Sequence, residues 1–206
     1  MNALKNFSFL VLTCFGADVD RVASAALGAL DAHDLRRRFS IKQDKASPGD
    51  IYTSSPTPGG AHLKRALLYE PTSKPGSTVL FVDLEDGWWT LVNAISEKLS
   101  GTHAQVRCTV ADEEFPMASF ELWSEHRSKR AVSCMKDDRG KWIFTSVGEP
   151  LEFEERTAYK RHRTADRLSP KMVVAYMKAL GWDVESPQFW QSNRPGVYLE
   201  EVKTHA

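Results

Sequence analysis

Cysteine is scarce in this chain of 206 residues, and its few positions form no motif. The three cysteines, Cys14, Cys108 and Cys134, are odd in number and widely spaced, and no two of them form a CxxC pair. This spacing argues against a disulfide framework. Each cysteine falls within a predicted strand, so we expect three small buried thiols in a protein of a reducing compartment.

An excess of charge of one sign is also missing, because 27 Lys and Arg balance 27 Asp and Glu. No global field would attract nucleic acid or an anionic membrane, and we expect neither as a partner. No apolar run approaches the roughly 20 residues that span a bilayer. Residues 7–15 follow Lys5 as in a signal peptide but lack a small-x-small cleavage pattern, so we expect a cytoplasmic protein.

The common catalytic motifs are absent from the sequence, which has no GxSxG, no Walker loop and no GxGxxG. The six histidines show no zinc-ligand spacing. Cys14 lies at a strand-to-helix turn, as a phosphatase nucleophile does, but Asp20 stands where that chemistry needs an arginine. We therefore expect neither a metal nor a cofactor, and the sequence leans against an enzyme without deciding the question.

What the chain does contain is organised around residues 78–99. Residues 78–82 form a short apolar run that is typical of a strand buried on both faces. Asp86 is a candidate N-cap, and Gly101 is a candidate left-handed C-terminal cap. Between them, apolar side chains repeat at helical spacing, at Trp88, Leu91, Val92, Ile95 and Leu99.

A similar strand and helix are predicted near the N-terminus, over residues 7–15 and 19–30. With an offset of 69 residues, Leu10–Leu12 fall on Val79–Phe81 and Val22 falls on Leu91, which suggests two related units. We expect one compact α+β domain, with a mixed or antiparallel sheet and helices packed on one face. Its sub-units would be residues 1–74 (β-α-β-β) and 75–206 (β-α-antiparallel meander-α with a C-terminal tail).

The remaining segments have clear local signals. Strands are predicted at residues 35–43, 61–70, 105–110, 118–124, 129–136 and 141–147, and residues 44–60 read as a long loop rich in Ser, Pro and Gly. Residues 151–153 suggest an edge strand, and residues 157–167 a charged surface helix. Ser169, Pro170 and Gly181 delimit a further helix, and the tail from Ser186 is expected to wrap the domain irregularly.

Two groups of side chains are candidates for a functional site. The first is acidic and follows two predicted strands, at Asp83, Glu85, Asp86, Asp112, Glu113 and Glu114. These carboxylates can serve a protein interface, or they can converge on a cation or act as an acid/base pair in a hydrolase. The second group comes from the six tryptophans, among which Trp89 and Trp190 stand in polar surroundings.

The second half of the chain resembles small cytoplasmic bacterial α+β proteins, some of which are immunity partners of secreted toxins. The resemblance rests on Asp86-Gly87-Trp88, the strand meander, residues 148–154 and the helix at 169–181. It implies a non-enzymatic protein that binds and neutralises a cognate bacterial toxin, but it assigns no residue to the interface. From the residues themselves, we expect that interface to be built from the acidic group, the loop at 47–60, Trp89 and Trp190. A metal-assisted or acid/base hydrolase is the alternative, and self-association through an edge strand of the meander is a third possibility.

Overall fold

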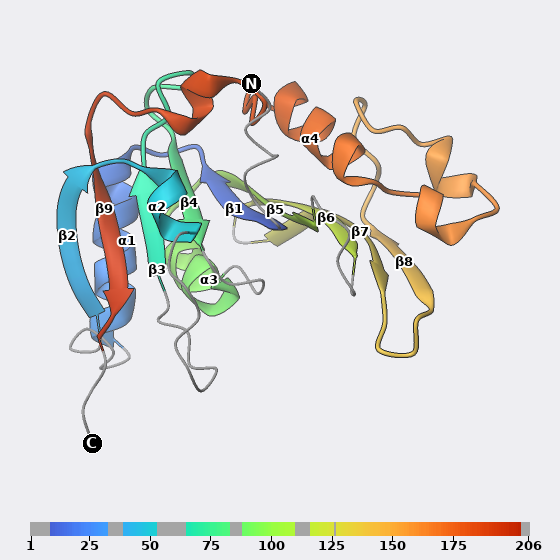
Figure 1. The fold of residues 1–206 in the computed structure, drawn as a ribbon, viewed down its shortest axis with the longest axis horizontal. Coiled ribbons are helices and arrows are strands. Elements are labelled where there is room, and N and C mark those ends of the chain that lie inside the picture. The colour runs from blue at the N-terminus through green and yellow to red at the C-terminus, as the bar shows by residue number, and fades with distance from the viewer. Residues whose placement is uncertain are drawn as a thin grey trace.

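The computed structural model describes residues 9–32, 39–52, 65–82, 88–109, 116–125 and 127–202. Figure 1 shows its helices and strands. The strands are β1 (Phe9–Phe15), β2 (Phe39–Lys45), β3 (Arg65–Tyr69), β4 (Thr78–Val82), β5 (Thr102–Thr109), β6 (Met117–Ser124), β7 (Arg127–Lys136), β8 (Trp142–Val147) and β9 (Pro195–Glu201). The helices are α1 (Val19–Ala32), α2 (Pro48–Tyr52), α3 (Trp89–Lys98) and α4 (Pro170–Ala179), with short 3-10 turns η3 (Ala158–Lys160), η4 (Thr164–Asp166) and η5 (Pro187–Trp190).

The nine strands of the described residues belong to one sheet, in the order β2-β9-β3-β4-β1-β5-β6-β7-β8. Every neighbouring pair is antiparallel. The predicted α+β class is therefore confirmed, and the two predicted sub-units contribute strands to the same sheet. The two central neighbours, β1 and β4, are the apolar runs from which the sequence predicted the core.

The centre of the sheet has the topology of a ferredoxin-like unit. The chain passes through β1, α1, β3, β4, α3 and β5, and the four strands lie in the order β3-β4-β1-β5. Leu12 and Phe81, which the 69-residue offset superimposes, are register partners across the β1–β4 pair. The relation ends there, because β2 and α2 are inserted before β3 while β6–β8 extend the second unit into a meander.

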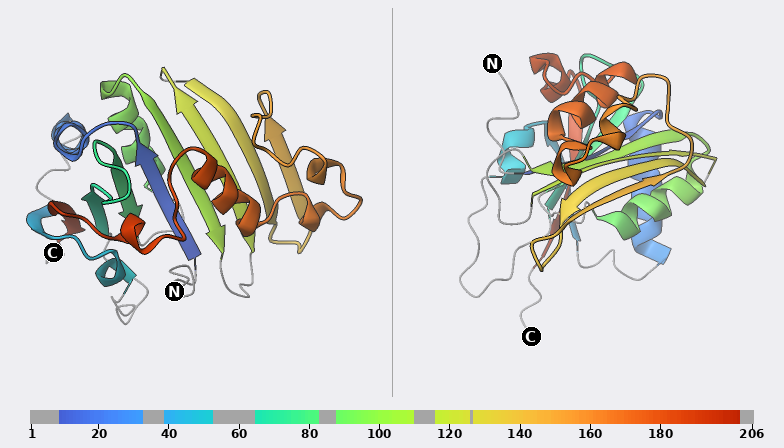
Figure 2. Two further views of the ribbon diagram at one scale, coloured as in Figure 1. Left: turned by 90° about the horizontal axis from the view of Figure 1, so that it is seen from above. Right: turned by 90° about the vertical axis from the view of Figure 1, so that its right-hand side faces the viewer.

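Helices cover both faces of the sheet, which corrects the expectation of a single covered face. Figure 2 shows α1 and α3 on one side of the sheet and α4 with the 3-10 turns on the other. Successive strand residues point to opposite faces. In β1, Val11 and Phe15 pack with α1 and α3, whereas Leu10, Leu12 and Cys14 share a core with α4.

The central strand and helix form as predicted, but the caps of the helix differ from the prediction. All five residues of β4 are buried. Trp88, not Asp86, occupies the N-cap position of α3, with a left-handed φ of 52° and no side-chain cap. Its ring packs on Phe39 at 5.5 Å. The helix ends at Leu99 in extended backbone, so the predicted left-handed cap at Gly101 is wrong.

The predicted start and stop signals of α4 are confirmed. Ser169 accepts a hydrogen bond from the Met172 amide, and Pro170 opens the helix. Gly181 has φ +84°. The Trp182 amide reaches back to the Met177 carbonyl at 2.9 Å, which closes a Schellman motif.

Four further segments depart from the predictions. Residues 195–201 form strand β9 inside the sheet and do not wrap it irregularly, and α2 lies within the predicted loop. Residues 151–153 form a turn, and residues 157–167 form the turns η3 and η4 where a helix was predicted. In the part of the chain that the structure describes, no helix is long and apolar enough to cross a membrane.

Candidate functional site

The half of the sheet formed by β5–β8 has two unlike faces. One face carries Phe120, Val132 and Cys134, which are buried in the core that includes α4. The register rows Met117–Met135–Ile143 and Glu121–Ala131–Val147 run across the other face. We call this second face the open face and define it by Arg107, Met117, Glu121, Trp123, Ala131, Met135, Ile143, Thr145 and Val147.

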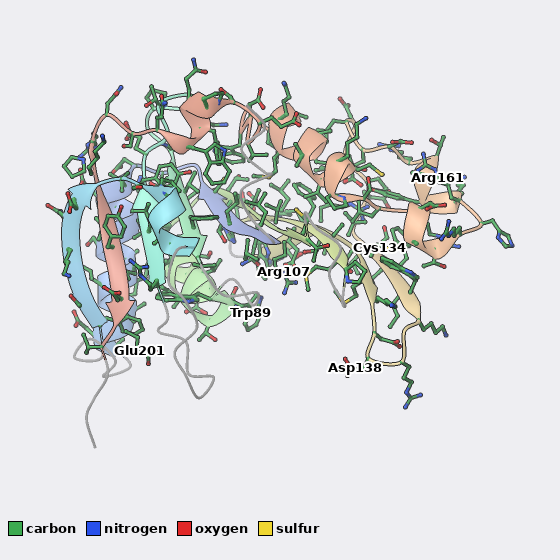
Figure 3. All side chains as sticks on the ribbon, in the orientation of Figure 1. Trp89, Arg107, Cys134, Asp138, Arg161 and Glu201 are labelled. Atoms are coloured by element: carbon green, nitrogen blue, oxygen red, sulfur yellow. The ribbon has the colours of Figure 1, made fainter. Side chains whose placement is uncertain are left out.

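No described helix lies against the open face of β6–β8 (Figure 1). The helices on this side, α1 and α3, pack on residues of β1, β3, β4 and β9. Ile143 and Val147 are consequently 44% and 58% exposed, although both are large apolar residues in a strand. Trp89, at the start of α3, is 51% exposed, and Figure 3 shows it on the same side of the sheet as Arg107.

The centre of the open face is a polar and aromatic cluster. Arg107 and Glu121 approach to 3.5 Å from neighbouring strands. The indole N–H of Trp123 donates to the same carboxylate at 3.3 Å. With Met117 and Met135 in the next row, the face gathers the aromatic, Met and Arg side chains that are enriched in protein interfaces.

His103 holds the ring of Trp123 in place. The two rings stack with centroids 5.8 Å apart, and Phe15 packs on the imidazole at 5.4 Å. Burial lowers the pKa of His103 to about 4, so the imidazole is neutral at pH 7. The Ser96 hydroxyl lies within hydrogen-bond distance of the ring. His103 is therefore a packing residue beneath the edge of the open face.

The opposite face is closed by a buried ion pair. Arg130 of β7 binds Glu154, with Nε to Oε1 at 2.8 Å and a terminal guanidinium nitrogen to Oε2 at 2.7 Å, and both side chains have no exposed surface. The guanidinium also donates to Ser146 Oγ and to the carbonyls of Val147 and Gly148. The pair ties the segment after β8 to the sheet, so it positions β8 from behind.

Two tyrosines complete this network. The hydroxyl of Tyr159 donates to Glu154 at 2.6 Å and lies 3.0 Å from the hydroxyl of Tyr176 on α4. Burial alone would raise the pKa of Glu154, but the hydrogen bonds from Arg130 and Tyr159 hold it below its ordinary value. The carboxylate is therefore charged, fully partnered and enclosed, which is the condition of a structural group.

The cysteines are buried as predicted. Burial raises the pKa of Cys14 well above its ordinary value and that of Cys108 to about 12. Cys134 donates its thiol proton to the Thr164 carbonyl at 3.2 Å. None of these thiols has the depressed pKa that a nucleophilic cysteine needs.

The residues that the sequence proposed for a site meet different outcomes. Asp83, Glu85, Asp86, Asp112, Glu113 and Glu114 lie outside the described residues. Trp89 is half exposed. Trp190 is partly buried, donates its indole proton to the Val184 carbonyl at 2.8 Å and packs edge-on against Phe81. The structure does not bring Trp190 and Trp89 into one cluster, because Trp190 packs on the core that includes α4, whereas Trp89 begins α3 on the other side of the sheet (Figure 2).

A polar depression of about 500 Å³ lies on the other half of the sheet, over β2, β9 and β3. Several of its polar groups bind one another within the protein. Arg65 pairs with Glu200 at 3.2 Å, and the Tyr198 hydroxyl donates to the Lys45 carbonyl while accepting from the Ser47 amide. We regard it as a less suitable site than the open face.

Sequence reasoning missed the open face for a physical reason. The residues of β8 alternate apolar and polar side chains only weakly, so the sequence does not show which face lacks a cover. The sequence also gives no sign that Glu154 differs from its acidic neighbours Glu152 and Glu155, which are exposed, whereas Glu154 is buried on Arg130. The sequence signal that could have revealed the open face is the run of large apolar residues within 142–147, next to a turn.

No family model, no curated protein and no solved structure matches this chain. Among the described residues, no group of three or more His, Cys, Asp or Glu side chains is arranged to hold a metal ion.

Proposed function

We propose that the protein is a binding protein whose open face takes a protein partner. One observation carries the proposal, namely that Ile143 and Val147 stand 44% and 58% exposed on a sheet face that no described helix covers. Exposed apolar surface rimmed by polar residues marks interaction sites in proteins.

The chemistry of the face supports a protein partner. Arg107 and Glu121 present a charged pair that is about three-quarters enclosed, at 26% and 21% exposed. Trp123 and the methionines beside it offer apolar contact area of the kind that anchors interfaces. A toxin domain, as the resemblance to immunity proteins implies, is the specific partner that we propose.

Affinity capture tests the proposal by comparing the wild type with variants that place a charge on the open face or at a distant exposed position. A tagged double variant, Ile143→Asp with Val147→Asp, introduces charge on the open face without entering the core. Val202→Asp is the matched control, because Val202 is 41% exposed at the far end of the sheet, beyond β9. We expect one stoichiometric partner with the wild type and the control, and its loss with the double variant. Capture that is equal for all three contradicts the proposal.

A further inference from the structure

The two edges of the sheet differ in how they are protected. A free edge strand offers unpaired backbone groups to another chain, and proteins commonly guard it with charges or proline. The edge strand β2 carries Lys42, Asp44 and Lys45. The other edge strand, β8, has the sequence WIFTSV, with neither a charge nor a proline. In the described chain no strand pairs with the outer side of β8, and Figure 2 shows this edge toward the viewer on the right.

A cationic segment overlies this edge on the side opposite to the open face. The segment of residues 156–167, here called the basic segment, contains five Lys and Arg residues and one Asp. It is fixed to β8 through Phe144, which packs against the ring of Tyr159 at 5.3 Å and lies 5.7 Å from the guanidinium of Arg167. The side chains of Lys160, Arg161, His162 and Arg163 are all exposed. Figure 3 labels Arg161 on this segment.

These two features define what a bound strand must look like. A strand added to β8 sends alternate side chains to the two faces of the sheet. One set lies next to Ile143 and Val147 on the open face, where apolar side chains fit. The other set lies beside Phe144 under the basic segment, where acidic side chains are attracted.

A second copy of this chain does not meet that description. Antiparallel pairing of two β8 strands about a twofold axis places both basic segments on the same face of the joined sheet. Each segment carries five cations and one anion, and one of the cations, Arg161, pairs with the adjacent Glu155. The positive charge that remains would repel the equivalent segment of the second copy. The charge of the segment therefore favours an acidic partner over self-association.

We propose that β8 is a docking edge for an extended segment of a partner protein in which apolar and acidic residues alternate. This inference rests on the proposed function and names the chemistry of the partner. Hydrogen bonds to the backbone of β8 provide affinity. The apolar and cationic faces fix the register of the bound strand, because a slip of one residue exchanges its two sets of side chains between the faces.

A peptide of defined sequence tests the proposal directly. The probe is a fluorescein-labelled ten-residue peptide of alternating Val and Glu, compared with alternating Val and Lys and with five Val followed by five Glu. Anisotropy measures affinity, and hydrogen exchange read by mass spectrometry locates the peptide. We expect the alternating Val and Glu peptide to bind at least ten-fold more tightly than both controls and to protect residues 142–147.

Charge variants supply the second arm of the test. Lys160→Glu with Arg163→Glu is expected to weaken the Val and Glu peptide at least ten-fold, whereas Lys171→Glu, an exposed position on α4, leaves binding unchanged. Equal binding of the Glu and Lys peptides, no binding of either, or protection elsewhere contradicts the docking edge. Displacement of the peptide by a single-stranded oligonucleotide that itself leaves residues 142–147 unprotected assigns the basic segment to phosphates and also overturns the proposal.

The same variants separate this inference from the proposed function. A captured partner that is lost with the Ile143→Asp and Val147→Asp pair but retained by the Lys160→Glu and Arg163→Glu pair supports the open face and contradicts the docking edge. Loss of the captured partner with each of the two pairs of substitutions supports both the open face and the docking edge.

Discussion

At the scale of single residues, Arg130 and Glu154 form the polar contact on which the end of the sheet depends. Removing one partner leaves a buried charge without its counter-ion, which costs about 3–5 kcal/mol. We expect Arg130→Met to lower the free energy of unfolding by about that amount, as measured by urea denaturation. The double variant Arg130→Met with Glu154→Met should be less destabilised than the single variant, because no charge stays buried.

The exposed pair of Arg161 and Glu155 is the matched control, with side chains 46% and 47% exposed. Surface pairs contribute about 0–1 kcal/mol, so Arg161→Met should change stability by no more than that. An equal loss of unfolding free energy in Arg130→Met and Arg161→Met would show that Arg130 is solvated and would contradict its burial.

His103 makes folding stability dependent on pH. Its folded pKa of about 4 lies below the ordinary value of 6.5, so the unfolded chain binds the proton more tightly. Stability from this group is complete above pH 6.5 and falls as the pH drops toward 4, by about 3 kcal/mol in all. Carboxylates such as Glu154 titrate in the same direction, so the difference between wild type and His103→Phe isolates the histidine.

The measurement is urea denaturation of both proteins between pH 4 and pH 7.5. Phenylalanine keeps an aromatic ring against Trp123 and removes the proton. We expect the wild type to lose more stability than the variant across that interval. Parallel curves would mean that His103 titrates alike in the folded and unfolded chains.

At the scale of elements, α4 tests the local signals that begin and end a helix. Ser169→Ala removes the oxygen that accepts from the Met172 amide and should cost about 1 kcal/mol. Gly181→Ala places a Cβ at φ +84°, 2.8 Å from Lys74 Nζ, and should cost about 1–2 kcal/mol. Thermal unfolding measures both, and Ala175→Gly at an exposed helical position provides a reference for helix propensity.

Strand β9 gives a sharper test, because it lies between β2 and β3 and pairs with both. A chain that stops at Arg194 loses Val197 and Leu199 from the core, leaves β2 without its partner strand and turns β3 into an edge strand. We expect it to lack the cooperative unfolding transition of the full chain. A stop after Glu201 is the control and should unfold as the wild type does. Cooperative unfolding of the shorter chain would contradict the placement of β9.

The elements differ in how far the sequence predicts them. Strand β4 and helix α4 were predictable because their signals are local, namely a continuous apolar run and a cap at each end. Strand β9 was not, because its Pro195 and Gly196 read as irregular chain and its place depends on partners about 130 to 160 residues away in the sequence. The ion pair of Arg130 and Glu154 was missed for the same reason, since charge alone does not reveal burial.

At the scale of the whole molecule, one sheet serves two purposes. Its centre is covered on both faces by α1, α3 and α4, which supplies the core. Within the described part of the chain, helices and turns cover only one face of its far half, β6–β8, and the Arg130 network holds that cover in place. The resulting open face combines exposed Ile143 and Val147 with Arg107 and Trp123. This arrangement is the basis for proposing a protein-binding function.

The most direct test of that proposal is hydrogen exchange on the complex with the captured partner, compared with the free protein. We expect slower exchange in residues 117–124, 127–136 and 142–147, with no change in α1 or in the β2–β9 pair at the opposite edge. Protection confined to α1, or to the depression over β2, β9 and β3, would contradict it and place the binding surface elsewhere.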